Sequence, residues 1–538
     1  MRIVHLTFKM YKAIAKPRGS NRSVQVSTMG QKGLNLEGLP EMMKLEYAKK
    51  IINYIPYSYG VGTRGGVEVQ GTKAGLTEGI TLFKYFRDDV FIVGYGTTIA
   101  TFDLSTATFT TLKDDFSTST RWGGDRCGEY FFVTNGVDRP YRIDSAYAIG
   151  IVTNAPICDD IAFIGPRAVA ISIESDETAV QLSDVDDGSN PPFDSWGTTT
   201  SATDGAIVNY RNAGKARTCV PLGQYFVVFS DDGYFAFTID QIDSAGTIKK
   251  IETVQDYMTD FGGARGAVAT PLGIFYLNER GLNQMTQVGS KDTPYSRQQK
   301  LNTVLLTDTY FDDVTAGNVD LIYDKKQRII LVTYAKGSSV NNKVLGYKIS
   351  EEIEALFEIE GWTINRFTKY KNKIYGSSSV DGRLFECFKG YTDDGVAIST
   401  EYTQELPLNG LWNRHSLKRF YSKGFLSLDT SIDVNMDIYD KEGAPISSKR
   451  INRWTPKRND NTIDGWGTSS WGNSSWGGDY DLSKMIEVTN WCRGRIANAQ
   501  RISVRFTSAV TEPHIINWFS AEIEDKGYIK VPAMTTIT

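Results

Sequence analysis

The sequence is poor in the residues that build many active sites and cross-linked domains. Among its 538 residues there are three histidines and five cysteines. His5, His415 and His514 show no HxxxH, HxH or ExxH spacing, so they indicate neither a histidine-based zinc site nor a Ser-His-Asp triad. The cysteines are odd in number and lack CxxC spacing, which argues against structural zinc and against a disulfide framework. We therefore expect buried thiols in a reduced chain. The five are Cys127, Cys158, Cys219, Cys387 and Cys492.

Sequence motifs of phosphate, sugar and calcium chemistry are also missing. No GxxxxGK[ST] string is present, and the glycine-rich stretch 60–66 is not a GxGxxG in a βαβ setting, so no phosphate cradle is expected. The segment 230–234, SDDGY, comes close to the Ser-x-Asp-x-Gly-x-x-Trp box of sialidases, but Gly follows the second Asp directly and no Trp arrives. The acidic segment 183–188 lacks the EF-hand spacing. We expect solvated turns at both, no catalytic, cofactor-binding or metal-binding residue, and no enzyme activity.

Long apolar runs and a strong charge imbalance are absent as well. Residues 1–20 carry Lys and Arg without a following apolar run, and no window of 18 apolar residues occurs, so neither a signal peptide nor a membrane span is predicted. With 59 Lys and Arg against 63 Asp and Glu, the net charge is −4. A dedicated nucleic-acid binder needs a concentrated basic surface, so that class is disfavoured, although nucleic acid could pass by without being gripped. We expect a soluble chain, made in the cytoplasm.

Glycine and aromatic residues are plentiful, whereas proline is sparse. The chain has 50 Gly and 16 Pro, and 12% of its residues are aromatic. This composition favours many short strands joined by tight turns. It argues against a helical bundle, in which each interior Gly costs about 1 kcal/mol. The predicted fold class is therefore all-β.

One pattern recurs from about 75 to 395: an apolar run, a turn and a second apolar run. Seven such hairpins start near positions 91, 130, 168, 225, 274, 329 and 373. Four-stranded propeller blades recur at about 40–50 residues, and continuous apolar runs suit the two inner strands of a blade, whose faces neighbouring blades cover. Asn-Gly and Asp-Gly suit the turns. The pattern predicts a β-propeller of six or seven blades over 75–395. A set of unrelated β-sandwich hairpins is the alternative.

Beyond residue 395 the strands become longer and alternate strictly. The segments 431–439, 501–506 and 515–524 have a period of two, typical of half-buried strands. They predict an antiparallel β-domain over 396–538. Between them, 454–480 is polar with a five-residue Trp-Gly period and cannot build a core, so we interpret it as a surface loop. Its tryptophans could stack on sugars or on protein partners, while packing within the chain is the alternative. They are Trp466, Trp471 and Trp476.

The N-terminal region, 1–74, is predicted to form an arm followed by a short helix. Residues 1–38 are polar and weakly periodic, so we expect an arm that contacts other chains or an adaptor. Pro40 suits a first helical turn, and Met42, Leu45, Ile52 and Ile55 fall near one helical face. The glycines of 59–66 should end that helix and lead into the strands of the propeller.

The order of these features resembles the tail nozzle or tail hub proteins of short-tailed bacteriophages, also called packaged-DNA stabilisation or tail tubular proteins. The resemblance covers most of the chain but is made of degenerate motifs. They are Gly33-Leu34-Asn35-Leu36, Asn53-Tyr54-Ile55-Pro56, Arg64-Gly65-Gly66-Val67-Glu68-Val69, the hairpin segment 131–142, and Arg493-Gly494-Arg495-Ile496. The family often has Arg-Pro-Gly where this chain has Arg64-Gly65-Gly66. No catalytic residue is carried over, because the role of the family is structural.

The resemblance implies a ring, a hexamer, in the tail of a virion assembled in the bacterial cytoplasm. The ring would extend the DNA channel below the portal and adaptor, retain the genome and allow its ejection. Expected partners are the portal and adaptor proteins, tail fibre or spike proteins, and double-stranded DNA that passes without specific binding. Two other functions stay open: a propeller glycoside hydrolase, which needs two carboxylates about 5–10 Å apart, and a carbohydrate-binding adhesin on host surface polysaccharide.

Overall fold

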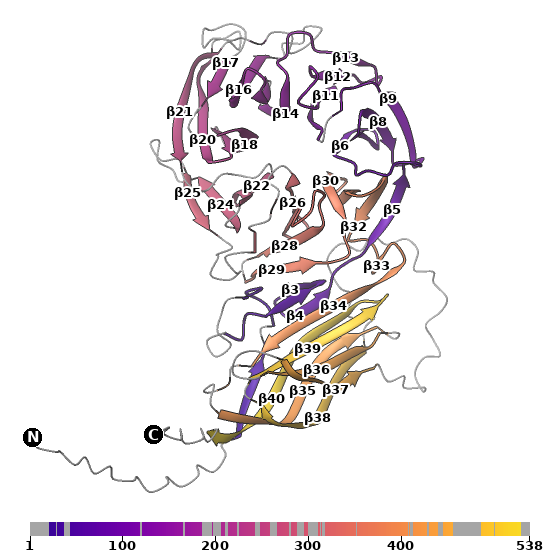
Figure 1. Ribbon diagram of the computed structural model, residues 1–538, viewed down its shortest axis with the longest axis vertical. Helices are drawn as coiled ribbons and strands as arrows, with labels where there is room; N and C mark the ends of the chain where they lie inside the picture. Colours follow the sequence, from indigo (N-terminus) through magenta and orange to yellow (C-terminus); the bar gives the residue numbers. More distant parts are fainter. Residues whose placement is uncertain are drawn as a thin grey trace, which may run out of the picture.

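The structure is a computed structural model of the chain. It describes residues 21–27, 29–36, 44–118, 121–164, 167–185, 196, 206–209, 214–222, 225–242, 248–258, 266–278, 281–287, 295–299, 310–311, 314, 318–350, 352–406, 408, 413–427, 430–439, 445–455, 486–499 and 501–528. Within this part of the chain all the regular elements are β-strands, β1 to β40 (Figure 1).

A β-propeller forms the upper body in Figure 1, and the described residues make seven blades. Blades 1 to 5 are separate four-stranded antiparallel sheets, whereas blades 6 and 7 are four-stranded antiparallel parts of one larger sheet. The first strand of each blade contacts the first strands of both neighbouring blades, so the ring closes from β30 back to β6. This confirms the predicted all-β propeller and fixes its blade number.

The strands of the first four blades follow in chain order. Blade 1 is β6 (Leu82–Arg87), β7 (Val90–Tyr95), β8 (Thr98–Asp103) and β9 (Thr108–Lys113); blade 2 is β10 (Gly123–Cys127), β11 (Tyr130–Thr134), β12 (Tyr141–Ile143) and β13 (Ile149–Ile151). Blade 3 is β14 (Cys158–Ile164), β15 (Arg167–Ile173), β16 (Asp176–Val185) and β17 (Ala206–Asn209); blade 4 is β18 (Ala216–Leu222), β19 (Tyr225–Ser230), β20 (Gly233–Ile242) and β21 (Ile248–Met258).

The last three blades complete the ring. Blade 5 is β22 (Ala267–Thr270), β23 (Gly273–Asn278), β24 (Gly281–Gln287) and β25 (Tyr295–Gln299); blade 6 is β26 (Asp320–Asp324), β27 (Ile329–Tyr334), β28 (Lys343–Ile349) and β29 (Glu354–Ile359). Blade 7 is β30 (Ile364–Tyr370), β31 (Lys373–Ser378), β32 (Arg383–Cys387) and β5 (Val67–Thr72).

The seven predicted hairpins are the second and third strands of the seven blades, β7–β8 through β31–β32. Every residue of β7, β15, β23 and β27 is buried, as expected for strands covered on both faces by neighbouring blades. Blade 7 is closed by a strand from the other end of the chain, because β5 pairs antiparallel with β32, Val67 opposite Cys387. The N-terminal strand β5 therefore completes the last blade of the ring through backbone hydrogen bonds to β32.

A two-sheet β-sandwich forms the lower body in Figure 1. One sheet contains β2 (Lys50–Ile52), β34 (Val396–Glu405), β36 (Ile432–Tyr439), β37 (Pro445–Trp454) and β39 (Arg501–Val510). The other contains β1 (Asn21–Val26), β3 (Tyr54–Tyr57), β4 (Gly60–Thr63), β35 (Asn413–Leu426), β38 (Ile486–Ala499) and β40 (His514–Tyr528).

The two sheets of the sandwich pack face to face around aromatic rings. Phe506 of β39 contacts Phe420, Trp454 and Phe519, with ring centroids 6.3, 5.7 and 5.6 Å apart. The three alternating segments predicted beyond residue 395 correspond to β36, β39 and β40. Their inward residues, among them Val434 and Ile523, are fully buried, as expected for an antiparallel β-domain. Residues 396–538 do not form this domain alone, because β1 to β4 of the N-terminal region belong to the same two sheets.

Two N-terminal predictions are wrong for the described residues. The helix expected from Pro40 to Ile55 is replaced from residue 50 onward by β2 and β3, because both faces of these short apolar runs are buried, which suits strands; residues 37–43 lie outside the described part. The arm expected over 1–38 is folded into the same chain from residue 21, since β1 pairs with β40 and buries Val24 and Val26. Residues 1–20 lie outside the described part.

The Trp-Gly segment also begins later than predicted. Trp454, its first residue in the sequence analysis, is the last residue of β37; it is fully buried, and its indole Nε1 donates to Ser422 Oγ at 3.0 Å. Trp454 is therefore part of the sandwich core. The tryptophans at 466, 471 and 476 lie outside the described residues.

Candidate functional site at the junction of propeller and sandwich

The propeller and the sandwich are joined through continuous sheets. β2 lies between the outer strand of blade 6 and the sandwich: Ile52 is parallel to β29 at Glu358 and antiparallel to β34 at Glu401. A second crossing uses β33 (Thr392–Asp393), which is parallel to β5 at Val67 and antiparallel to β34. Hydrogen-bonded strands therefore connect the sandwich to blades 6 and 7 at two places, which makes the junction stiff.

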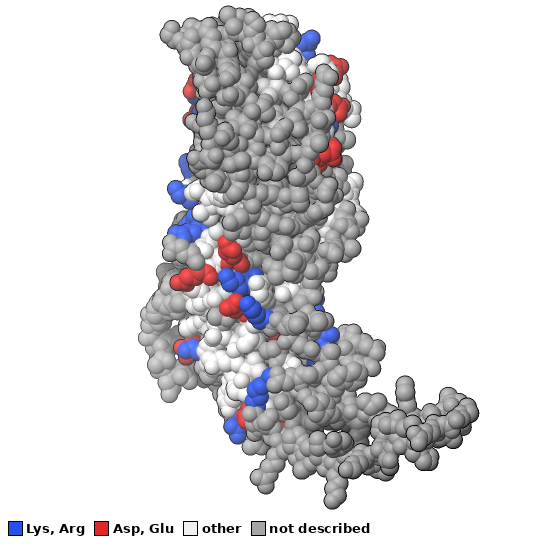
Figure 2. All heavy atoms as spheres, turned by 90° about the vertical axis from the view of Figure 1, so that its left-hand side faces the viewer, with Lys and Arg blue, Asp and Glu red and all other residues white. Residues whose placement is uncertain are grey.

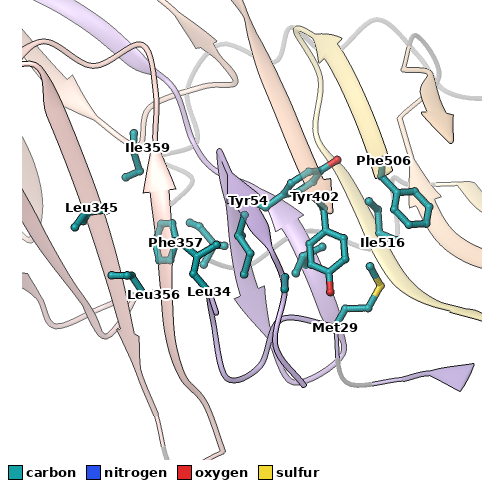
Figure 3. Close-up of a cluster of buried hydrophobic side chains, with 14 of the residues drawn as sticks. Met29, Leu34, Tyr54, Leu345, Leu356, Phe357, Ile359, Tyr402, Phe506 and Ile516 are labelled. Atoms are coloured by element: carbon teal, nitrogen blue, oxygen red, sulfur yellow. The ribbon is translucent and has the colours of Figure 1, made fainter. Parts of the chain in front are cut away.

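One apolar core crosses the junction. Side chains of blade 6, of the N-terminal strands and of the sandwich belong to a single buried cluster. Figure 3 shows the order of its layers from blade 6 to the sandwich. The labelled residues are Leu345, Leu356, Phe357 and Ile359 of blade 6, then Leu34 and Tyr54, then Met29, Tyr402, Ile516 and Phe506.

A buried arginine stands at the centre of the junction. Arg64 is fully buried, and its guanidinium donates to both carboxylate oxygens of Asp393, at 2.8 Å from Nη1 and 2.5 Å from Nη2. Nε donates to Asn53 Oδ1 at 2.7 Å, and the remaining contacts are to the carbonyls of Glu360 at 2.8 Å and Gly65 at 2.9 Å. All three guanidinium nitrogens are thus used, as a buried charge requires.

Asn53 and Trp362 complete the cluster. Asn53 has a φ of 59°, a left-handed conformation that Asn tolerates better than most residues. Its Oδ1 also accepts from the Glu360 backbone N at 2.9 Å, and its Nδ2 donates to the Ser399 carbonyl at 2.7 Å. Trp362 donates from Nε1 to Asp393 Oδ1 at 3.1 Å, and the Arg64 guanidinium lies 4.8 Å from its ring.

Two glycines let the backbones approach at this point. A Cβ on Gly66 would lie 1.9 Å from the Thr392 carbonyl oxygen, and one on Gly65 would lie 2.7 Å from Phe388 Cα. Backbone atoms cannot yield as a flexible side chain does, so both positions require glycine. The run Arg64-Gly65-Gly66 therefore combines a buried guanidinium group, which donates several hydrogen bonds, with the close approach of two backbone segments of the chain.

Three of the five segments that carry the resemblance meet at this junction. Gly33 abuts blade 6, because a Cβ there would lie 2.4 Å from the Leu356 backbone N. Asn53 and Arg64 form the polar cluster, and Val67 begins the strand that closes blade 7. By contrast, 131–142 is a hairpin of blade 2 that includes most of β11 and the start of β12, and in its turn Asn135 Nδ2 donates to Asp138 at 2.8 Å. The segment 493–496 lies in β38, with side chains outside the described part.

The other residues singled out in the sequence are dispersed. His415 and His514 are buried in the sandwich, and Cys158, Cys219 and Cys387 are buried in different blades. Burial raises the pKa of the Cys158 and Cys219 thiols to about 12, so both stay protonated at neutral pH. Cys127 is partly exposed. His5 lies outside the described part, and Cys492 lies in β38 with its side chain undescribed.

The two acidic segments fold differently: 230–234 contains the turn between β19 and β20, whereas 183–185, predicted as a solvated turn, is the end of strand β16. Asp231, in the β19–β20 turn, pairs with Arg217 through two contacts of 2.5 and 2.9 Å. Ser183 is buried in β16, where its Oγ accepts from the Ala168 backbone N at 2.9 Å; residues 186–188 lie outside the described part. In the described ranges, no group of three or more His, Cys, Asp or Glu could hold a metal ion, and no helix could cross a membrane.

The segment Arg64-Gly65-Gly66 is recognisable in the sequence, but the partners of Arg64 are not. Asp393 is 329 positions away, and nothing in the local pattern around it distinguishes it from other acidic turn residues. Asn53 and Trp362 give no local signal either. The one local signal is the pair of glycines directly after Arg64, a pattern that indicates close approach of another backbone segment.

Comparisons with known proteins bear on the fold alone. No protein-family model and no curated protein matches the chain. Among solved structures, 60% of the chain is similar to 91% of a chain in the crystal structure of the mitotic checkpoint complex, with 10% identity and a TM-score of 0.40. It is similar to the computationally designed Ika8 protein (60% and 99% covered, 10% identity, TM-score 0.35) and to BamB from Moraxella catarrhalis (62% and 93% covered, 11% identity, TM-score 0.36).

Proposed function

We propose that this chain is a structural subunit of a bacteriophage tail, one copy in a nozzle or hub ring below the portal and its adaptor. The ring, a hexamer by resemblance, extends the DNA channel, closes it until infection and allows genome ejection. The chain acts without catalysis and without a cofactor, in the tail of a virion assembled in the bacterial cytoplasm. Its partners are other copies, portal and adaptor proteins, tail fibre or spike proteins, and passing genomic DNA.

The observation that carries this proposal is the convergence of three resemblance segments on the junction. Residues 33–36, 53–56 and 64–69 are spread over the N-terminal region, yet all of them lie where the propeller meets the sandwich. A ring subunit held between two other components needs two bodies that keep a fixed relation. Continuous sheets and the buried Arg64–Asp393 pair supply that stiffness.

The charge distribution agrees with DNA passing without being gripped. Residues 75–395, which contain six complete blades and most of the seventh, have 30 Lys and Arg against 43 Asp and Glu, a net charge of −13. Figure 2 shows acidic and basic side chains interspersed over the described part of one face, without a broad basic area. Affinity for duplex DNA grows with the number of phosphates neutralised, so such a surface favours sliding over binding.

The test is mass photometry of the purified protein, alone and with the neighbouring particle proteins. We expect a discrete ring of several 59.9 kDa chains that electron microscopy shows around a channel wide enough for duplex DNA. A protein found as peripheral spikes off the tail axis would contradict the proposal and favour the adhesin. Hydrolysis of host polysaccharide that one Asp→Asn or Glu→Gln change abolishes would favour the glycosidase.

A further inference from the structure

Charges alternate from strand to strand across the outward face of one sheet of the sandwich. Glu401 of β34 contacts Lys50 of β2 at 3.3 Å, and Glu405 of the same strand contacts Arg501 of β39 at 3.0 Å. The basic column of β39 in turn contacts the acidic column of β36. In the order β2, β34, β39 and β36, the charged side chains on this face are therefore basic, acidic, basic and acidic.

The last step of this ladder ends on a basic edge strand. Arg505 of β39 pairs with Asp437 of β36 through two contacts, at 2.8 and 3.1 Å. Asp433 of β36 is approached by both Arg450 and Arg453 of β37, each at 3.5 Å. One carboxylate therefore faces two guanidinium groups, so the edge carries an excess of positive charge.

Exposure rises toward the same edge. The Arg501 side chain is 17% exposed and that of Arg505 30%, whereas those of Arg450 and Arg453 are 56% and 54% exposed. Residues 445–450 are all exposed, so this half of β37 is uncovered on both faces, and Ile446 is an exposed apolar residue at its start. Among the described residues, β37 pairs only with β36.

We propose that β37 is a docking edge for an acidic extended segment of another protein, which adds to this sheet as the next strand. Backbone hydrogen bonds supply the attachment, and alternate Asp or Glu side chains continue the ladder against Arg450 and Arg453. Pairing of β37 with β37 of a second copy is disfavoured, because it sets two basic columns side by side. This proposal does not depend on the tail function.

The probe is a fluorescein-labelled peptide, Thr-Glu-Val-Glu-Val-Glu-Thr, blocked at both ends, with a Lys-for-Glu peptide as its control. Anisotropy with the full chain should show binding of the acidic peptide alone, weakening as salt is raised. In R450E/R453E the acidic peptide should bind about tenfold or more weakly, and the Lys peptide should gain affinity. Hydrogen exchange should slow at the amides of β37.

A matched control places the same charge change away from the edge. Lys418 and Arg419 lie on β35, between β38 and β40, and are 45% and 58% exposed. K418E/R419E should bind the acidic peptide as the wild type does. Where R450E/R453E fails to fold, judged by its unfolding midpoint, R450Q/R453Q replaces it.

The outcomes that overturn the proposal are specific. They are absence of binding at about 1 mM peptide, equal binding by R450E/R453E, equal loss in K418E/R419E, or protection away from β37. Binding that appears only after residues 456–485 are replaced by a short Gly-Ser linker would identify that segment of the chain as the occupant and also overturn the proposal.

Discussion

Arg64 and Asp393 are 329 positions apart and form a two-point ion pair at the crossing of the propeller and the sandwich. Arg64 lies between β4 of the sandwich and β5 of blade 7, while Asp393 ends β33, which leads into β34. The pair therefore links the two chain segments that run between the sandwich and blade 7, from β4 to β5 and from β32 to β34. Since a buried charge without its partner is costly, the two residues depend on each other.

Replacing Arg64 should uncouple the two bodies. In R64A, Asp393, Asn53 Oδ1 and the Glu360 carbonyl all lose a donor, so we expect a loss of about 3–5 kcal/mol in the free energy of unfolding. The unfolding free energy of R64K should lie between those of R64A and the wild type, because the Lys ammonium group keeps the charge but cannot reproduce the two-point contact of the guanidinium with Asp393. Denaturant unfolding should change from one transition to two.

Arg383 is the matched control for Arg64. It pairs with Asp381 and Asp394, but its side chain is 35% exposed. R383A should cost no more than about 1 kcal/mol, since exposed pairs contribute little. Equal effects of R64A and R383A would contradict a special role for the buried pair.

The glycines of the junction should not tolerate alanine. In G66A the new Cβ meets the Thr392 carbonyl, and the backbones must separate, so we expect a loss of at least about 2–3 kcal/mol. G150A is the control, because a Cβ there has no neighbour within 4 Å. Thermal unfolding of both variants measures the difference, and similar midpoints would refute the argument.

The repeating hairpins were predictable, because one middle strand in several blades, β7, β15, β23 and β27, is buried on both faces and forms a continuous apolar run in the sequence. Fourth strands gave a weaker signal, since β9 is half exposed and β13 has only three residues. The closing strand β5 was missed for another reason. Its partner β32 lies more than 300 residues away, and pairing at that distance leaves no local periodicity.

The prediction of an N-terminal helix was wrong because a short apolar run is compatible with either a helix or a strand. Residues 50–57 carry apolar side chains near one helical face, yet Ile51, Tyr54 and Ile55 are buried together as parts of two strands. Burial by the sandwich overrides the helical spacing. The same long-range packing determines the junction, so Arg64 could be noticed in the sequence while Asp393 could not.

The N-terminal residues should separate into a dispensable and a necessary part. Deleting 1–20 should leave the unfolding free energy unchanged. Deleting 1–26 also removes β1, with buried Val24 and Val26, and should cost on the order of 3 kcal/mol. Equal stabilities of the two truncations would show that β1 does not contribute to the sandwich.

The interface role expected for the arm and the Trp-Gly segment should appear in assembly and not in folding. Residues 1–20 of the arm and the three tryptophans of the Trp-Gly segment lie outside the described residues. The deletion of 1–20 and the triple change of Trp466, Trp471 and Trp476 to Ser test the two segments separately. We expect monomers of wild-type stability that form rings or particles poorly, since interface tryptophans contribute strongly to association. Wild-type assembly by both variants would remove these segments from the interface.

Acid should destabilise the sandwich through His514. Its Nε2 is 2.6 Å from the Tyr54 hydroxyl, and burial lowers its pKa to about 3. The unfolded chain binds a proton near pH 6.5 but the folded chain does not, so stability is complete above about pH 6.5 and falls as pH drops toward 3. Between pH 7 and pH 5 this residue alone should cost about 2 kcal/mol. Denaturant unfolding of wild type and H514Q at both pH values isolates that difference, because carboxyl titrations are common to both proteins.

The NMR resonances of the His514 ring should also stay constant down to about pH 4.5. Parallel pH profiles of the two proteins, or titration of that ring near pH 6.5, would show that His514 is not held neutral by its burial.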